Sequence, residues 1–216
     1  MPLKKGDFIE IDYIAKDKDT SSIVDLTSEE EAKKNNIHNK NTKYKPVIIC
    51  IGENQILKGI DEFLINKEAN KEYEIEILPE KAFGKKDPKL MKMMPTQEFK
   101  KQNINPFPGL QVRMDNIIGT IRTVSGGRTI VDFNHPLAGH TLIYKIKVNK
   151  IVKEDDKKIK SILSPISDDV KVFVKEEVAE IDLELPDAFQ KEISNKIKQL
   201  IPKIKEIKFK NKLKNN

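Results

Sequence analysis

A short proline-containing bend that leads straight into a strand is the most constraining feature of this chain. The bend is Asn134-His135-Pro136-Leu137-Ala138-Gly139-His140-Thr141-Leu142, and Ile143-Tyr144-Lys145-Ile146 follows it. Pro136 fixes its own φ angle, while Gly139 can adopt conformations that other residues avoid. Apolar residues then alternate with polar ones over 142–152, which predicts a half-buried strand. The chain must therefore turn sharply here and enter a sheet.

Composition limits the size and the environment of the fold. The 216 residues suggest one large domain or two to three small ones. Hydrophobic residues make up 38% and charged residues 34%, so the cores must be small and the surface densely charged. Cys50 is the single cysteine and sits in an apolar run over 47–51, which predicts a small buried hydrophobe rather than a reactive thiol. One cysteine cannot form an internal disulfide, which fits a reducing compartment.

Charge and hydropathy argue against two classes of partner. The 40 basic residues are interspersed with 34 acidic ones, so the net charge of +6 is not the footprint of a specific nucleic-acid binder. No apolar run approaches the ~18 residues of a membrane helix. The first residues turn charged at once and hold no apolar signal core. We therefore expect a cytoplasmic protein with no membrane contact.

Short strands separated by turns account for most of the first 150 residues. Residues 27–31 resemble a helix start, with Thr27 or Ser28 as the cap, and the apolar residues of 56–64 share one helical face. Ser125-Gly126-Gly127 predicts a hairpin turn. The strands expected from alternation are 8–15, 23–26, 46–51, 72–78, 110–114, 117–124 and 128–133.

The last third begins with a charge run over 154–158, which we interpret as a linker. Alternation predicts strands over 170–174 and 178–185. A helix follows, with an apolar stripe formed by Phe189, Ile193, Ile197, Leu200 and Ile201, and Pro202 ends it. The lysine-rich tail from Lys203 to Lys214 is expected to be a solvated end; docking on acidic surfaces or ribosomal RNA is the alternative.

The order of these segments resembles the FKBP-type peptidyl-prolyl isomerases, in their SlyD-like branch. The match runs from residue 1 to about 152, and no single motif carries it alone. The resembling segments are Ile11-Asp12-Tyr13, Val24-Asp25, Pro46-Val47 to Ile51-Gly52, Ile56-Leu57-Lys58-Gly59-Ile60, Ala82-Phe83-Gly84, and the Asn-His-x-Leu-Ala-Gly bend with Tyr144 beyond it. The long stretch between Gly84 and Asn134 resembles the insert-in-flap chaperone domain of that branch. The chain is similar to long-chain archaeal members.

The resemblance implies an α+β fold in which an FKBP-like antiparallel half-barrel wraps on a short helix. Residues 1–84 and 137–152 would form the isomerase domain. Residues 85–136 would form a small inserted β-rich domain. Residues 153–216 have no match and are expected to form a small α+β domain. Its helix carries an apolar stripe that must be covered by the isomerase domain, by a second copy or by a partner; we prefer a second copy and expect a homodimer.

By the same resemblance, a pocket between sheet and helix would hold proline. Rotation about an amide faces a barrier of ~18–20 kcal/mol, and an apolar site favours the twisted state without breaking a bond. Val47 and Ile60 depart from the aromatic residues of the best-known small members, which suggests a looser grip and argues against macrolide inhibitors. The residues implied in catalysis are Tyr13, Asp25, Val47, Ile56, Leu57, Ile60, Phe83, Leu137, Ala138 and Tyr144.

Each polar candidate also has an ordinary structural interpretation. Tyr13 and Tyr144 could be core aromatics, and Asp25 could cap a turn. The histidines His38, His135 and His140 lack the spacing of a metal site, so we expect neither a metal nor a cofactor.

The insert holds four of the five methionines, which form either its own core or a pliable surface for unfolded chains. A domain of this size buries its apolar residues poorly, which favours an exposed groove. The residues proposed to bind clients are Met91, Met93, Met94, Phe99, Phe107 and Leu110. Two functions remain: an isomerase with a chaperone insert that acts on unfolded or nascent chains containing X-Pro bonds, or a holdase chaperone without significant isomerase activity.

Overall fold

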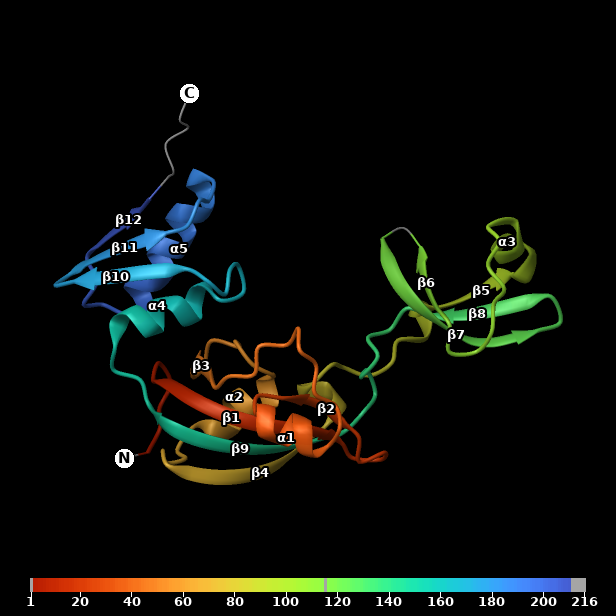
Figure 1. The fold of residues 1–216 in the computed structure, drawn as a ribbon, viewed down its shortest axis with the longest axis horizontal. Helices are drawn as coiled ribbons and strands as arrows, with labels where there is room; N and C mark the ends of the chain where they lie inside the picture. The colour runs from red at the N-terminus through yellow and green to blue at the C-terminus, as the bar shows by residue number, and fades with distance from the viewer. Residues whose placement is uncertain (1, 115, 211–216) are drawn as a thin grey trace. The chain divides into compact units, whose positions relative to one another are not determined.

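The computed structural model describes residues 2–114 and 116–210, which divide into two compact units (Figure 1). Unit 1 combines Met1–Ile77 with Ile143–Asn216, and unit 2 is Leu78–Leu142. The fold is mixed α+β and its sheets are mainly antiparallel. Among the described helices, none combines the length and the apolar character that a bilayer crossing requires.

The main sheet of unit 1 is built around a long first strand. Its five strands are β1 (Phe8–Asp17), β2 (Ile23–Leu26), β3 (Val47–Cys50), β4 (Lys71–Ile77) and β9 (Leu142–Ile151). The order is β2-β1-β9-β4, and Figure 1 shows β1, β9 and β4 side by side. The first half of β1 also pairs with β3, and its second half pairs with β2. The strands expected in this part of the chain are confirmed.

Two short helices accompany this sheet. In α1 (Glu29–Lys34), Ser28 is the N-cap and its hydroxyl accepts a hydrogen bond from the Glu31 backbone N–H, which confirms the helix start read from the sequence. The second helix, α2 (Lys58–Leu64), begins two residues later than expected, because Leu57 is extended with a ψ of 136°. The buried Asp61 carboxylate accepts hydrogen bonds from the backbone N–H groups of Gly52 and Asn54, which fixes the loop before the helix.

The C-terminal part of unit 1 corrects two expectations. The charge run over 154–158 is not a linker: Glu154 is the N-cap of α4 (Asp155–Leu163). The lysine-rich tail is not all solvated end, because it contains β12 (Glu206–Phe209), which pairs in parallel with β11 (Val178–Asp182). Residues 211–216 lie outside the described residues. The remaining elements, β10 (Lys171–Lys175) and α5 (Asp187–Leu200), agree with the predicted strand and helix.

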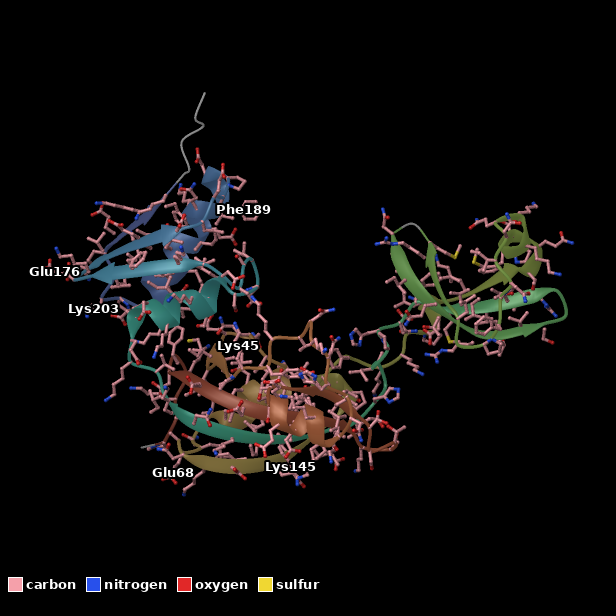
Figure 2. All side chains as sticks on the ribbon, viewed as in Figure 1. Lys45, Glu68, Lys145, Glu176, Phe189 and Lys203 are labelled. Atoms are coloured by element: carbon pink, nitrogen blue, oxygen red, sulfur yellow. The ribbon has the colours of Figure 1, made fainter. Side chains whose placement is uncertain are left out.

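The apolar stripe of α5 is covered within the same chain. Ile197 and Ile201 are buried and belong to one core with Ile159 and Leu163 of α4 and with the sheet β10-β11-β12. Phe189, labelled in Figure 2, is the exception and is 56% exposed. The same core includes Phe8 of β1, Cys50 of β3 and Val152, so this segment packs on the back of the main sheet.

Unit 2 contains a four-stranded antiparallel sheet in the order β5-β8-β7-β6. Its strands are β5 (Met91–Pro95), β6 (Gln111–Met114), β7 (Ile117–Ser125) and β8 (Arg128–Asp132), with α3 (Thr96–Lys101) and the 3-10 turns Pro79–Lys81 and Pro88–Leu90. Gly126 and Gly127 have φ angles of 56° and 75°, as the expected hairpin turn requires. Strand β5 was not predicted. A small core of Phe99, Val112, Ile121 and Val131 holds the sheet together.

Candidate functional site

A tyrosine–aspartate pair stands on two neighbouring strands of unit 1. Tyr13 lies on β1 and Asp25 on β2, where Ala15 pairs with Asp25 in register. The Tyr13 hydroxyl donates a hydrogen bond of 2.8 Å to Oδ2 of Asp25, and the Leu26 N–H donates one of 2.8 Å to Oδ1. Asp25 is exposed, so the carboxylate is on the solvent side of the pair.

A second tyrosine, Tyr144, lies beside this pair, and Tyr13, Asp25 and Tyr144 together are called the polar group below. Tyr144 of β9 lies with its ring centroid 5.5 Å from that of Tyr13, at an interplanar angle of 47°. Burial raises the pKa of Tyr13 far above its usual range, and the nearby charge of Asp25 and the hydrogen bond to it raise that pKa further. Burial and the same charge raise the pKa of Tyr144. Both phenols therefore stay neutral near physiological pH and can act as hydrogen-bond donors.

A buried threonine locks the three strands that carry this group. The Thr27 hydroxyl accepts a 3.0 Å hydrogen bond from the Tyr13 N–H and donates one of 2.7 Å to Oδ1 of Asp12. Asn149 of β9 donates a 2.8 Å hydrogen bond to Oδ2 of Asp12. Sequence reasoning missed this network, because it considered Thr27 only as a helix cap. The available signal was two hydroxyl residues in a row where a helix needs one cap.

The apolar candidates of unit 1 differ in how much surface they leave accessible. Ile60 of α2 is fully buried, while Ile56 and Leu57, just before α2, are half-buried. Val47 is half-buried on β3 opposite Ile11, and strand alternation puts it on the face of the buried Ile49. Half-buried aliphatic side chains of this kind can contact an apolar ligand without unfolding the core.

The other three candidates come together in unit 2 around His135. The rings of Phe83 and His135 stack with centroids 4.2 Å apart and an interplanar angle of 2°. His135 Nδ1 accepts a 3.1 Å hydrogen bond from the Leu137 N–H, and its carbonyl accepts one of 2.8 Å from the Ala138 N–H. Sequence reasoning tested His135 only as a metal ligand and so missed this supporting role. The signal was its position inside the family bend.

Two glycines join the turn that carries Phe83 to the bend that carries His135. The Gly139 N–H donates a 2.8 Å hydrogen bond to the Gly84 carbonyl, and both residues have positive φ angles, 81° and 78°. These backbone conformations are costly for side chains with a Cβ atom. The aromatic turn at 82–84 and the bend at 134–142 thus form one piece.

A polar network ties the start of the insert to its end. Oδ1 of Asn134 accepts a 2.8 Å hydrogen bond from the Asp87 N–H, and its amide donates one of 3.1 Å to the Asp87 carbonyl. Asp132 accepts hydrogen bonds from Asn134 and from Arg122 Nε. Burial alone would raise the pKa of Asp132, but these hydrogen bonds and the Arg122 charge outweigh it and lower that pKa. The two connecting segments are therefore held side by side.

The proposed client-binding residues divide between a core and a surface. Phe99 is 4% exposed in the core of the insert, and Met94 and Leu110 pack partly against that core. Met91, Met93 and Phe107 are exposed. A groove of about 380 Å³ is lined by Leu90, Lys92, Met93, Met94, Met114, Ile117 and Phe133. The methionine cluster thus divides into Met94, which packs partly against the core, and Met91 and Met93, whose side chains are exposed.

Covalent and metal chemistry find little support in the described residues. Cys50 is fully buried, which confirms the prediction of a small buried hydrophobe, and burial is the chief cause that raises the pKa of its thiol to about 12. Across residues 2–114 and 116–210, no group of three or more His, Cys, Asp or Glu side chains could hold a metal ion.

The chain is similar in sequence to one family model and to several known proteins. The family model described as "FKBP26, IF domain" matches residues 92–137. The "Short-type peptidyl-prolyl cis-trans isomerase" of Methanocaldococcus jannaschii is 32% identical over 149 residues, which cover 69% of this chain and 94% of the relative. The "FKBP-type peptidyl-prolyl cis-trans isomerase SlyD" of Helicobacter pylori is 34% identical over 113 residues, 50% of this chain and 60% of the relative.

Proposed function

The chain belongs to the FKBP-type peptidyl-prolyl cis-trans isomerases, and from this premise we propose that it isomerises X-Pro bonds in unfolded or partly folded chains. We propose further that residues 85–136 act as an insert-in-flap chaperone domain that holds these chains. The single observation that carries the catalytic proposal is the hydrogen-bonded pair of Tyr13 and Asp25 beside the ring of Tyr144.

To catalyse this reaction, the protein needs mainly a binding site of suitable shape and polarity. The amide barrier is ~18–20 kcal/mol, and the twisted transition state has lost the resonance that makes the planar amide polar. Half-buried Ile56, Leu57 and Val47 would supply an apolar surface that withholds water from the planar state. Rotation would then need less energy than in water, with no nucleophile involved.

The polar group would orient the peptide instead of attacking it. The Tyr13 proton is donated to Asp25, so the Tyr13 oxygen would act as an acceptor, while the neutral Tyr144 hydroxyl would act as a donor. The exposed Asp25 carboxylate would accept hydrogen bonds from the bound backbone. Phe83, Leu137 and Ala138, which the resemblance implies in catalysis, remain proposed apolar contacts for the peptide and are held together around His135 within unit 2.

The groove of the insert supports the chaperone proposal. Met93 is 60% exposed and Ile117 57% exposed, and both line it. Monomeric proteins seldom expose large apolar residues in one patch without a binding role. Methionine side chains adapt to many sequences, which suits a binder of unrelated unfolded chains.

A prolyl-isomerisation assay on short peptides tests the catalytic proposal. We expect the wild type to accelerate isomerisation and Asp25→Ala to lose about tenfold or more in kcat/KM, as expected for a hydrogen bond to a charged group. Asp19→Ala, in an exposed turn of the same unit, is the matched control and should keep the wild-type rate. No acceleration by the folded wild type on any X-Pro peptide would leave the holdase as the function.

The compartment of the protein and its self-association are two further proposals. The single buried Cys50 fits a reducing compartment such as the cytoplasm. For self-association through the described part of 153–216, the exposed large apolar side chains are Ile166, Phe173 and Phe189, since the rest of the α5 stripe is covered. Sedimentation of the full chain tests it, and a monomer at micromolar concentration would contradict it.

A further inference from the structure

The positive charge of this chain is concentrated in the insert. Residues 85–136 contain nine lysines and arginines against four acidic residues, a net charge of +5. The other 164 residues contain 31 basic and 30 acidic side chains, a net charge of +1. A quarter of the chain thus carries almost all of the net charge of +6. The surplus of positive charge thus belongs to the same domain as the exposed apolar groove.

The basic residues lie at the groove itself as well as around it. Lys92 lines the groove, and Lys89 precedes the lining residue Leu90. Within the described residues, neither lysine belongs to an ion pair. The nearest strongly buried acid on the neighbouring strand, Asp132, is already paired with Arg122. The groove therefore combines apolar walls with one lysine in its lining, Lys92, and a second, Lys89, next to the lining residue Leu90 in the chain.

We propose that the insert selects client segments in which apolar residues are flanked by acidic ones. This inference rests on the proposed client-binding role of the groove. Apolar side chains would fill the space between Met93, Ile117 and Phe133, while glutamates or aspartates would meet Lys89 and Lys92. Charges at the rim of an interface chiefly raise the association rate and set its dependence on salt. A single exposed ion pair contributes little, so several are needed for a clear preference.

Nucleic acid is the other polyanion that such a charge could attract. The groove argues against it, because its walls are methionine, leucine and isoleucine with one aromatic ring, Phe133. Single-stranded nucleic acids are held by stacking on several exposed aromatic rings as well as by charge. An acidic polypeptide satisfies the apolar walls and the two lysines together.

Peptides with one shared apolar core and different flanks test the proposal on the full chain. The cores contain no proline, which keeps the isomerase site out of the measurement, and the flanks are glutamate, serine or lysine. We expect the glutamate peptide to bind about tenfold tighter than the lysine peptide at ~0.1 M salt, by fluorescence anisotropy. The difference should largely vanish at ~1 M salt, where the screening length falls from ~10 Å to ~3 Å.

Two variants that lower the net charge in different units locate the effect. The double substitution Lys89→Glu with Lys92→Glu should remove most of the preference for the glutamate peptide. Lys147→Glu, at an exposed position of β9 in unit 1, changes the charge in the same direction and should leave the preference intact. A preference reduced in proportion to net charge by both variants would contradict a role for the two lysines at the groove.

The outcomes separate this inference from the function beneath it. Equal binding of all three peptides overturns the acidic preference and leaves the client-binding role standing. No binding of any peptide means that the client-binding role itself fails. Single-stranded RNA that displaces the glutamate peptide and binds more tightly than it does would overturn the choice of an acidic polypeptide.

Discussion

The main sheet of unit 1 and the sheet of the insert are built from similar strands but differ in how much of their apolar side chains they bury. In unit 1, large aliphatic residues such as Ile9, Ile11 and Ile146 are fully buried, and a second core on the back of the sheet joins β1 to α4. The insert has four fully or nearly buried hydrophobic residues at its centre and leaves Met93, Phe107 and Ile117 exposed.

The difference follows from what each region would bind. Lowering a rotational barrier requires a site whose groups keep fixed positions, and a deep core with polar locks such as Thr27 provides that rigidity. Holding unrelated unfolded chains requires apolar surface that can adapt. A shallow core with a methionine-lined groove provides it at the cost of local stability.

Matched substitutions of isoleucine sharpen this comparison most strongly. Ile146→Ala removes a buried side chain from β9 and should lower the free energy of unfolding by about 2–5 kcal/mol. Ile117→Ala, in the groove, should change it by about 0.5 kcal/mol or less while weakening client binding. Denaturant unfolding and peptide titration measure both. A comparable loss of stability at the two positions would contradict the contrast.

A double-mutant cycle at the polar pair comes next in size. Asp25→Ala and Tyr13→Phe should each lower kcat/KM on a short prolyl peptide. The double variant should lose less than the sum of the two single losses, because both substitutions remove the same hydrogen bond. The coupling should be about 1–3 kcal/mol. Affinity for a proline-free client should not change. A loss of client affinity in these variants would mean that the two functions share one site.

The strands and helices with a strong local signal were predictable from the sequence. Strand β2 and the cap at Ser28 are where alternation and capping rules put them. Strand β5 was missed because Met91-Lys92-Met93-Met94-Pro95 has no β-branched residue and forms through pairing with the distant β8. Helix α4 was missed because the acids of its first turn looked like a linker, although Ile159 and Leu163 stand four residues apart.

The candidate site was predictable only in part, for a related reason. Tyr13, Asp25 and Tyr144 came from the resemblance, and the structure brings them together. The residues that hold them, Thr27 and Asp12, act through contacts between strands far apart in the sequence. No local rule identifies such contacts before the sheet register is known.

Acid should loosen the insert before the main sheet. Hydrogen bonds from Asn134 and Arg122 hold the pKa of Asp132 in the folded chain below its ordinary range, so its contribution to stability is present above that range and is lost as the pH falls through the lowered folded pKa. Hydrogen exchange of the described amides in 87–134, corrected for the intrinsic exchange rate at each pH, should therefore rise below about pH 4. In Asp132→Asn this pH dependence should largely disappear. Unchanged exchange in the wild type at low pH would contradict the role of the network.

The smallest expected effect is at alkaline pH. Since the pKa values of Tyr13 and Tyr144 are raised above 10.0, both phenols stay protonated and the rate on short peptides should be flat from about pH 7 to 9.5. Above pH 10 the unfolded tyrosines ionise first, so the free energy of unfolding should fall as the pH rises. A rate that declines with an apparent pKa near 9 would show that one phenol is not buried as described.

Excision of the insert tests the division of labour most directly. Residues 88–133 can be replaced by a short loop that keeps His135, because Asn134 makes hydrogen bonds of 2.8 and 3.1 Å to the backbone of Asp87. Both chains are then assayed on a short prolyl peptide and on the proline-limited refolding of a protein. We expect the peptide rate to stay within about threefold, while the acceleration of refolding falls by about 100-fold as tethering of the client is lost. Equal activity of the two chains on both substrates, or an equal loss on both, would contradict the account.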